Sequence, residues 1–409
     1  MDATLLERAR MLDAADPLAP FRARFSIPEP GLVYFDGNSL GRPPLAALEA
    51  VQRAGAGQWA GELIRGWTGA AGWLEGPVRV GDLLGRGVLG ARDGEVAVTD
   101  STTVNLYRLA SAALDARPSR RAIAIGASEF PSDRYVVEGL AAARGLAIRW
   151  LDDDPVDGLR VADVDRVLDD DLALLVLSHV NYRSAAIARM PEVTARARAA
   201  GALVLWDLCH SAGALPVDLA ANAVDLAVGC TYKYLNGGPG APGYLYVRRE
   251  LQDELRPPIQ GWFAQSDQFE MGSGFRPQAG IRGWLVGTPG IIGLAAAEAG
   301  IALSAEAGVA AVRAKGIALT EFAIELHDAW LAPLGCSLGS PREAARRGDH
   351  VAIRHPDARW LTGALIERGV IPDFRAPDTV RIGLSPLTTS FDEVRRGLEV
   401  LRDLLHGRA

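Results

Sequence analysis

A single lysine, Lys233, stands between two tyrosines in the segment TYKYLNGGPG at residues 231–240. The segment follows the apolar run DLAVGC at residues 225–230 and continues into a turn rich in glycine and proline. An ammonium group held among aromatic side chains at the edge of a core loses hydration, which favours a nucleophilic amine and Schiff-base chemistry. A lysine that lies along the apolar surface and reaches solvent is the alternative. Residues elsewhere in the chain must decide between the two.

A second candidate is the carboxylate of Asp207, near the end of the apolar run ALVLWDL at residues 202–208. His210 follows three residues after it. A carboxylate at the end of a buried strand needs a cationic or hydrogen-bonding partner, and a protonated heterocyclic nitrogen would be such a partner. An aspartate that caps a following helix is an equally open interpretation.

The third candidate is an anion site after the run EVAVTD at residues 95–100, where the sequence continues as STTVNLYRL. Thr102 and Thr103 would stand at a helix N-terminus, where hydroxyls and free N–H groups bind phosphate. A plain Ser/Thr helix cap is the other interpretation. Taken together, an anion site, a strand-end carboxylate and a lysine in a glycine-rich turn are what pyridoxal phosphate requires for its phosphate, ring nitrogen and aldehyde.

The elements that must position these residues form a regular series. Short apolar runs alternate with segments long enough for helices, for example PEVTARARAAG at residues 191–201. Runs that are apolar throughout predict strands buried on both faces of a mainly parallel sheet, and ligands bind such sheets at the carboxyl ends of the strands. The expected strands lie in residues 95–100, 121–126, 146–152, 172–180, 202–208, 225–230 and 243–249.

The predicted fold class is α/β, with a large pyridoxal-phosphate-binding domain and a smaller C-terminal domain. The large domain, residues 61–290, holds a mainly parallel mixed sheet flanked by helices. Residues 1–60 are expected to pack on this core and on a dimer interface, and residues 291–409 to form the α+β domain. Within the smaller domain we expect strands in residues 350–356 and 379–386 and helices in residues 360–369 and 391–405.

The composition is that of an ordinary folded chain and excludes several classes of function. A net charge of −7 argues against binding nucleic acid, which requires clustered Lys and Arg. Three cysteines and six histidines show no disulfide or metal-ligand spacing, so we predict no metal and a reducing, cytoplasmic setting. The apolar stretch at residues 291–312 contains Glu298 and Glu306, which favours a buried or interfacial helix over a membrane span.

Eight segments, in order along the chain, resemble the kynureninases, which are fold-type-I pyridoxal-phosphate enzymes of the aspartate aminotransferase superfamily. They are YFDGNSLG (34–41), STTVNLYRL (101–109), EFPSDRY (129–135), LSHVNYRSA (177–185), WDLCHSAGALPVDL (206–219), TYKYLNGGPGAPGYLYV (231–247), QGWFAQSDQFEM (260–271) and VRIGLSPL (380–387). The resemblance covers nearly the whole chain, and the combination is specific to this family within the superfamily.

The resemblance implies a set of cofactor-binding residues. It implies that Lys233 forms the Schiff base, that Asp207 pairs with the ring nitrogen, and that Tyr232 reaches the phosphate and transfers a proton. Phe130 would stack on the ring, and Asp133 would lie on its polar side. The remaining implied cofactor contacts are Thr102, Thr103, Pro131, Ser132, Ser178, His210, Trp262 and Thr288.

The resemblance also implies a substrate and a dimer. Arg381 would bind the substrate α-carboxylate with its planar guanidinium. Trp262 and Thr288 would come from the neighbouring subunit, which makes a homodimer the catalytic unit. Trp67 is a candidate contact for an aryl ring, and an ordinary buried aromatic residue is equally open. The implied reaction is hydrolysis of the Cβ–Cγ bond of L-kynurenine or 3-hydroxy-L-kynurenine to anthranilate or 3-hydroxyanthranilate and L-alanine, in tryptophan catabolism and NAD biosynthesis.

Some alternatives stay open at the level of sequence. The family's GTPP and GWFG segments read GTPG (287–290) and GWFA (261–264) here, which leaves the preferred ring substituent undecided. A β-lyase or desulfurase acting on another amino acid is the main rival, although a desulfurase needs an exposed cysteine and Cys209 and Cys230 lie on or beside expected strands. A binding protein that merely kept the fold would have lost its chemical residues, and these are present.

Overall fold

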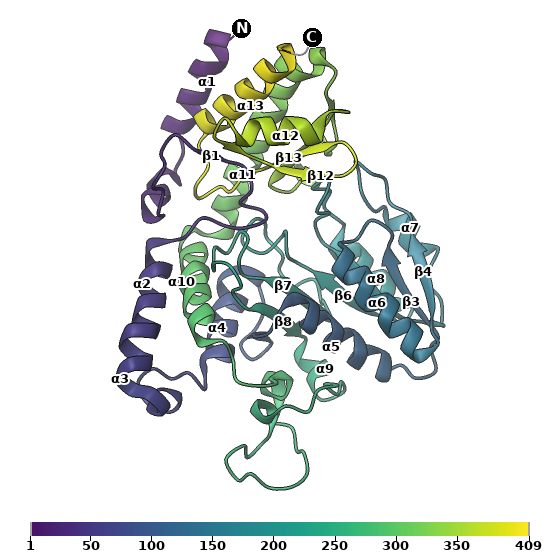
Figure 1. Cartoon of the computed structure of the whole chain (residues 1–409). Coiled ribbons are helices and arrows are strands. Elements are labelled where there is room, and N and C mark those ends of the chain that lie inside the picture. Colours follow the sequence, from purple (N-terminus) through teal and green to yellow (C-terminus); the bar gives the residue numbers. More distant parts are fainter. Residues whose placement is uncertain (1, 408–409) are drawn as a thin grey trace.

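The computed structural model describes residues 2–407 and contains a large and a small α/β unit (Figure 1). The larger unit is built on a seven-stranded sheet in the order β2-β8-β7-β6-β5-β3-β4. All neighbouring strands are parallel except where β8 runs antiparallel to β2 and β7. The strands are β2 (Val96–Val98), β3 (Ala122–Gly126), β4 (Ala147–Leu151), β5 (Leu172–Ser178), β6 (Leu203–Asp207), β7 (Leu226–Cys230) and β8 (Gly243–Val247), which confirms all seven predicted runs.

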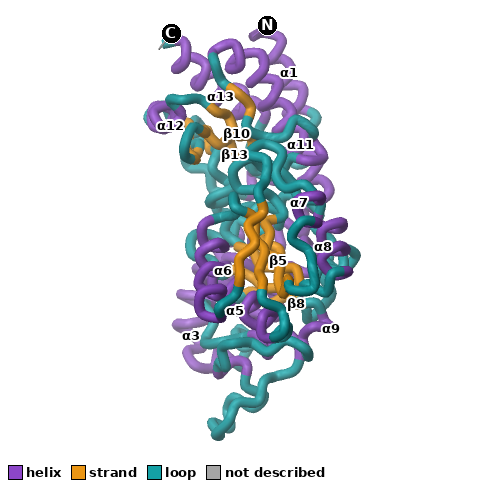
Figure 2. Tube along the Cα trace, turned by 90° about the vertical axis from the view of Figure 1, so that its right-hand side faces the viewer, coloured by secondary structure: helices purple, strands orange, loops and turns teal. Residues whose placement is uncertain are grey.

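The central strands are apolar throughout because both faces of the sheet are covered. In β6, Leu203 and Leu205 pack into one hydrophobic cluster, whereas Val204 and Trp206 pack into another on the opposite face. Figure 2 shows α5 and α6 on one side of the strands and α7 and α8 on the other. The helices of this unit are α2 (Leu45–Gln52), α3 (Ala60–Glu62), α4 (Gly76–Leu84), α5 (Thr102–Asp115), α6 (Pro131–Arg144), α7 (Val161–Asp165), α8 (Met190–Ala199), α9 (Arg249–Gln252) and α10 (Ile291–Ala307).

The smaller unit contains a four-stranded antiparallel sheet in the order β12-β13-β10-β9. The strands and helices predicted for this region are confirmed as β10, β13, α12 and α13. The short β9, β11 and β12 were not predicted, because a strand of two or three residues leaves no apolar run. The elements are β9 (Ser337–Leu338), β10 (His350–Arg354), β11 (Val370–Ile371), β12 (Asp373–Arg375), β13 (Thr379–Gly383), α11 (Val309–Leu326), α12 (Ala358–Ile366) and α13 (Phe391–His406).

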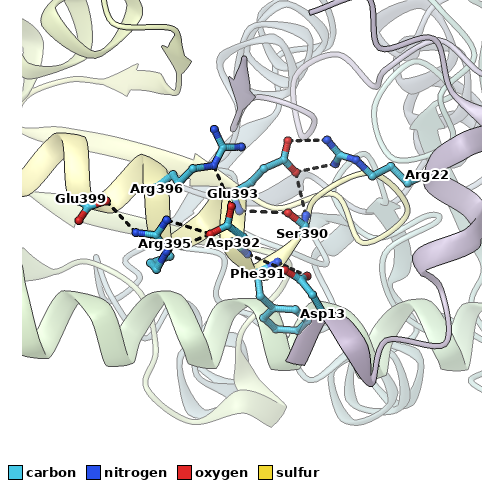
Figure 3. A network of polar contacts seen from close by, with 9 residues as sticks. All are labelled: Asp13, Arg22, Ser390, Phe391, Asp392, Glu393, Arg395, Arg396 and Glu399. Carbon is cyan, nitrogen blue, oxygen red and sulfur yellow. Dashed lines mark hydrogen bonds and ion pairs between the residues drawn. The ribbon is translucent and has the colours of Figure 1, made fainter. Parts of the chain in front are cut away.

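The beginning of the chain is bound to the smaller unit. Helix α1 (Asp2–Ala14) places Leu5 and Ala9 in the hydrophobic cluster of α11, α12 and α13. Figure 3 shows the polar part of this contact, in which the carboxylate of Asp13 accepts hydrogen bonds from the N–H groups of Phe391 (2.8 Å) and Asp392 (3.0 Å). Because these N–H groups lie in the first turn of α13, a residue from α1 caps that helix.

The segment after α1 crosses from the small unit to the large one. Strand β1 (Val33–Tyr34) pairs with β11, and the N–H of Gly383 donates to the carbonyl of Phe35 (2.7 Å). Further along, the N–H of Gly41 donates to the carbonyl of Tyr232 (2.8 Å), beside Lys233. Residues 34–44, which belong to the region 1–60 expected to pack on the large domain and on a dimer interface, thus lie between the two units of one chain.

The apolar stretch at residues 291–312 forms a buried helix, as predicted, but the helix is broken. Gly308 adopts a φ of +80° between α10 and α11, a conformation that favours glycine. Helix α10 packs Leu294 and Ile301 into the core of the large sheet, although it lies beyond the predicted domain boundary at residue 290. The division of the chain into three regions stays a prediction. Among residues 2–407 no single helix is long and apolar enough to cross a membrane; α10 and the segment Val309–Leu334 meet that requirement only as a pair bent by 81°.

The cap on α13 leads to a first prediction. Replacing Asp13 with alanine removes the acceptor of two N–H groups and should lower the free energy of unfolding by about 1 kcal/mol. Urea unfolding followed by tryptophan fluorescence measures the loss. Glu7→Ala is the matched control, because Glu7 is an exposed acid on the same helix, and its effect should stay within about 0.5 kcal/mol. Equal losses in the two variants would contradict the capping role.

Candidate active site

A cavity of about 230 Å³ opens at the carboxyl ends of β5, β6 and β7, where the small unit faces the sheet. Ser178 and Asp207 are the last residues of β5 and β6, and Lys233 follows the end of β7. Arg381 on β13 contributes from the small unit. The remaining lining residues are Asn38, Ser39, Thr102, Thr103, Phe130, Ser132, Asp133, Val180, Tyr182, Cys209, His210, Tyr232 and Arg375.

Most of the residues that the sequence singled out therefore meet at one cavity. Eleven predicted site residues line it, although they come from segments spread over 280 residues of the chain, from Thr102 to Arg381. Pro131 does not line it, and instead begins α6, where its fixed φ suits the first helical position. Trp67, Trp262 and Thr288 are also absent from the lining.

The amine of Lys233 is held beside an imidazole. Its Nζ lies 3.1 Å from Nε2 of His210 and 6.0 Å from the centre of the Phe130 ring. Burial first, and the Lys233 cation second, lower the pKa of His210. The neutral imidazole can accept a hydrogen bond from the ammonium group, so His210 orients Lys233 toward the cavity.

Two carboxyl groups lie close together in the cavity lining. Oδ1 of Asp207 accepts a hydrogen bond from the N–H of Cys209 (2.6 Å), and residues 208–225 form turns and loops, so Asp207 caps no helix. Asp133 lies in the first turn of α6, where burial first and the neighbouring Asp207 second raise its pKa. Its Oδ2 is buried with no partner within residues 2–407. A neutral carboxyl beside a strand-end carboxylate can hold a ring that carries a cationic N–H.

The N-terminus of α5 combines both interpretations that the sequence left open. The Ser101 hydroxyl caps the helix by accepting from the N–H of Val104 (3.4 Å). Thr102 and Thr103, the first two residues of the helix, line the cavity instead. A Cβ at Gly243 would lie 2.9 Å from the backbone nitrogen of Thr102, so glycine is required there to leave the helix start in place. This arrangement directs hydroxyls and the positive end of the helix dipole at the cavity.

The guanidinium of Arg381 is buried and already holds a carboxylate. It donates to the Tyr182 carbonyl (2.7 Å), to the Ser39 hydroxyl (2.8 Å) and to Oδ2 of Asp373 (2.5 Å). Asp373 also pairs with Arg375 (2.6 Å), which lines the cavity as well. An arginine pair with a shared carboxylate thus forms the small-unit wall. An external carboxylate can bind here if Asp373 shifts to Arg375.

Sequence reasoning assigned no role to Asn38, Ser39, Tyr182, Cys209 or Arg375, all of which line the cavity. Ser39 and Tyr182 lie in the segments YFDGNSLG and LSHVNYRSA, which marked the resemblance and gave a usable signal. Arg375 stands six residues before Arg381 in no recognised motif, so nothing in the sequence pointed to it.

Trp262 and Trp67 lie away from the cavity of their own chain but close to one another. Both make edge-to-face contacts with Phe263, at 5.3 Å and 5.7 Å between ring centres. Trp262 is 42 % exposed, and Trp67 also packs against Trp73. Thr288 is exposed too. Their predicted action from a neighbouring subunit stays a prediction.

The lining residues fit pyridoxal phosphate. The cavity brings together an amine, two hydroxyls at a helix N-terminus, an aromatic ring and a strand-end carboxylate. The buried polar atoms of the lining that have no hydrogen-bond partner in the described part of the chain include Oδ2 of Asp133 and Nδ1 of His210. Buried atoms of this kind normally have partners, so they indicate a ligand with complementary donors and acceptors.

Comparison with known proteins agrees with this geometry. A family model described as the kynureninase C-terminal domain matches residues 312–401. A kynureninase from Pseudomonas fluorescens is 43 % identical over 400 residues, covering 96 % of this chain and 94 % of that protein. The chain belongs to the kynureninase family. Its departures from that family's GTPP and GWFG segments lie outside the cavity lining.

Several solved structures share the fold of this chain. A cysteine desulfurase from Thermococcus onnurineus NA1 has a TM-score of 0.80 at 21 % identity, covering 97 % of this chain and 98 % of that one. A C-DES variant with glycine covalently linked to its pyridoxal-phosphate cofactor has a TM-score of 0.79 at 20 % identity, covering 93 % and 99 %. At this level of identity the likeness concerns the fold alone.

The buried pair of Arg381 and Asp373 leads to a second prediction. Asp373→Asn leaves the Arg381 charge without its nearest carboxylate and should lower the free energy of unfolding by about 2 kcal/mol. Asp378→Asn is the control, since Asp378 pairs with the half-exposed Arg354 and its loss should cost less than about 1 kcal/mol. Urea unfolding of the two variants measures the difference. A smaller loss for Asp373 than for Asp378 would show that Asp373 does not hold Arg381.

Proposed function

We propose that the chain hydrolyses the Cβ–Cγ bond of L-kynurenine to anthranilate and L-alanine, with pyridoxal phosphate as cofactor, in tryptophan catabolism. The observation that carries this proposal is the meeting of Lys233, Asp207 and Arg381 at one cavity, in a chain related to kynureninases over nearly its full length. Water supplies the oxygen of the new carboxylate. The geometry gives no preference between kynurenine and 3-hydroxykynurenine, and both belong in the test.

We assign the cofactor contacts as follows. Lys233 provides the amine for the aldehyde, Thr102 and Thr103 hold the phosphate, and Asp207 keeps the ring nitrogen protonated. Held by these residues, pyridoxal phosphate would supply an electron sink for the α- and β-carbons of the substrate. Phe130 is 39 % exposed toward the cavity and offers its ring face as a support.

The side chains around the cavity can carry the proton transfers. Lys233, once free as an amine, is the base that removes the substrate α-proton, and His210 at 3.1 Å orients it. The neighbouring Cys230 first, and burial second, raise the pKa of Tyr232, so its hydroxyl keeps its proton. A protonated Tyr232 can deliver that proton to the β-carbon of the departing alanine. Arg381 binds the α-carboxylate after Asp373 turns to Arg375.

The cysteines argue against the desulfurase alternative, although the fold is shared with desulfurases. Cys209, Cys230 and Cys336 are all buried. Cys209 lines the cavity, but its hydrogen bond with Cys230 first, and burial second, raise its pKa, which disfavours a thiolate there. Cys336 lies in the hydrophobic cluster of the small unit, and burial raises its pKa to about 11. A desulfurase nucleophile must be an accessible thiolate, so hydrolysis of kynurenine is the better-supported function. The three unbridged thiols also support the proposed cytoplasmic setting.

We propose that the working unit is a homodimer. The segment between α9 and α10 extends as a loop at the bottom of Figure 1 and carries the exposed Trp262, Phe269 and Met271, which are 42, 58 and 71 % exposed. Exposed aromatic and methionine side chains of this kind are typical of interfaces. Trp262 and Thr288 would reach the cavity of the second subunit.

The central test uses the fact that the chain contains only two lysines, Lys233 and Lys315. Purified protein should show a visible absorbance band from bound pyridoxal phosphate and release fluorescent anthranilate from L-kynurenine. Lys233→Ala should lose the band and at least 10³-fold of the activity, because the nucleophilic amine is gone. Lys315→Arg is the control, since Lys315 pairs with Asp16 away from the cavity and arginine keeps that charge.

Borohydride reduction followed by peptide mass spectrometry should place the pyridoxyl group on Lys233 and leave Lys315 unmodified. A visible band without anthranilate or 3-hydroxyanthranilate would reject the reaction but keep the cofactor. A protein that never acquires the band would reject both.

A mixing experiment tests the shared site. Lys233→Ala and Trp262→Ala should each be inactive as pure proteins, yet subunit exchange between them should restore roughly a quarter of the wild-type activity, because mixed dimers contain one intact site. Mixing Lys233→Ala with Asp207→Ala is the control and should restore nothing, since both residues act in the same subunit. No recovery in the first mixture would reject a contribution of Trp262 across the interface.

A further inference from the structure

The carboxylate of Glu129 lies in the wall between two cavities. One side of this wall faces an interdomain cavity of about 400 Å³ between the two units, which Glu129 lines together with Ser128, Asp153 and Asn181. The other side is formed by Ser178, which lines the candidate active site. Glu129 is not among the residues that line the candidate active site, and the proton transfers described above do not use it.

Glu129 is held by both polar groups of Ser178. Its Oε1 accepts from the backbone N–H of Ser178 (2.9 Å), and its Oε2 accepts from the Ser178 hydroxyl in a short hydrogen bond. A Cβ at Gly126, the last residue of β3, would lie 3.1 Å from Cγ and Oε1 of Glu129. The glutamate therefore folds back over the end of β3 to reach the end of β5.

This bond decides what Ser178 presents to the active site. Ser178 is the register partner of Asp207 on the neighbouring strand, so the two side chains lie at the same depth in the site. A hydroxyl that donates its hydrogen to an ionised Glu129 offers only lone pairs to the cavity. A protonated Glu129 can itself donate to Ser178, which then turns its hydrogen toward the cavity. The charge of Glu129 thus selects an acceptor or a donor on the ring side.

The groups around Glu129 are mostly acidic. Burial first raises the pKa of Glu129 to about 7, the Ser178 bonds lower it, and Asp207 and Asp153 raise it. No ion pair to Glu129 occurs within residues 2–407; Arg134, which lines the same interdomain cavity, donates to the Ala127 carbonyl (3.4 Å). The other charged groups facing Glu129 or its cavity are Asp133, Asp152, Arg183, Arg354 and Asp378.

We propose that Glu129 is a positioning residue for the cofactor ring, which fixes the Ser178 hydroxyl and gives up its proton when a cationic ring nitrogen binds beside Asp207. The inference rests on the proposed function. A positive charge next to Asp207 offsets the acidic surroundings and stabilises the Glu129 carboxylate. The released proton passes to solvent through the interdomain cavity that Glu129 lines. Binding of the cofactor in the active-site cavity is thereby linked to the protonation of Glu129, which lines the interdomain cavity.

The first experiment counts protons. Calorimetric titration of pyridoxal phosphate into the full chain freed of cofactor, at pH 7 in buffers of different ionisation enthalpy, gives the number of protons released. Glu129→Gln should release about half a proton fewer than wild type, since a group with a pKa near 7 is about half ionised there. Glu254→Gln, which removes an exposed acid paired with Arg117, is the control and should match wild type.

Equal proton release in Glu129→Gln and wild type would overturn the inference and leave the proposed function intact. Absence of pyridoxal-phosphate binding by wild type would overturn both. Gly126→Ala supplies a second variant that keeps the charge but crowds Glu129 away from Ser178; it should weaken pyridoxal-phosphate binding about tenfold, as loss of a supporting contact does. Unchanged affinity in Gly126→Ala would reject the positioning role.

The second experiment needs no cofactor. An acid whose pKa is raised by folding stabilises the folded state fully below its ordinary value of 4.5, and that contribution is lost between this value and a pH of about 7. Cofactor-free wild type and Glu129→Gln should therefore unfold at nearly equal temperatures at about pH 4, where Glu129 is protonated in both the folded and the unfolded chain. Above pH 8 the variant should unfold about 1–3 °C higher. A constant difference across this range would reject the ionisable role of Glu129.

Discussion

The parallel alignment of β5, β6 and β7 is the constraint on which the rest of the structure depends. Parallel strands that are neighbours in register end at the same edge, so Ser178, Asp207 and the approach to Lys233 meet without any contact between their own side chains being required. The glycine-rich turn after Lys233 and the helix starts of α5 and α6 add groups to the same edge. A one-residue slip of β6 would send Asp207 to the wrong depth and move its neighbours to the opposite face.

This edge of the sheet carries more carboxyl groups than cationic side chains. Asp133, Asp207 and Glu129 lie within reach of one another, and Lys233 is the cation that the large unit sets against them. On the small-unit wall the arrangement is reversed, with Arg375 and Arg381 sharing Asp373. A zwitterionic amino acid whose amino group faces the acids and whose carboxylate faces the arginines complements both walls.

The sequence predicted the elements and residues whose signal is local. All seven large strands are visible as apolar runs because burial on both faces leaves no alternation. The sequence alone could not predict contacts between distant segments. Ser39 meets Arg381 across 342 residues, and the pairing of Asp373 with Arg375 depends on a short strand without an apolar run. The break at Gly308 was missed because the helical pattern is continuous across it, and only tertiary packing bends the chain there.

The N-terminal segment is connected in different ways to the two walls of the active-site cavity. Helix α1 is fastened to α13, and residues 34–44 pass from β13 to the Lys233 turn, carrying Ser39 against Arg381. Any opening of the small unit would withdraw Arg381, Arg375 and the Ser39 loop together, while Thr102, Asp207 and Lys233 stay on the sheet. With such a hinge, the groups that hold the cofactor stay in place while the groups that bind the substrate move away. The molecule could then release its product with every turnover and keep its prosthetic group throughout.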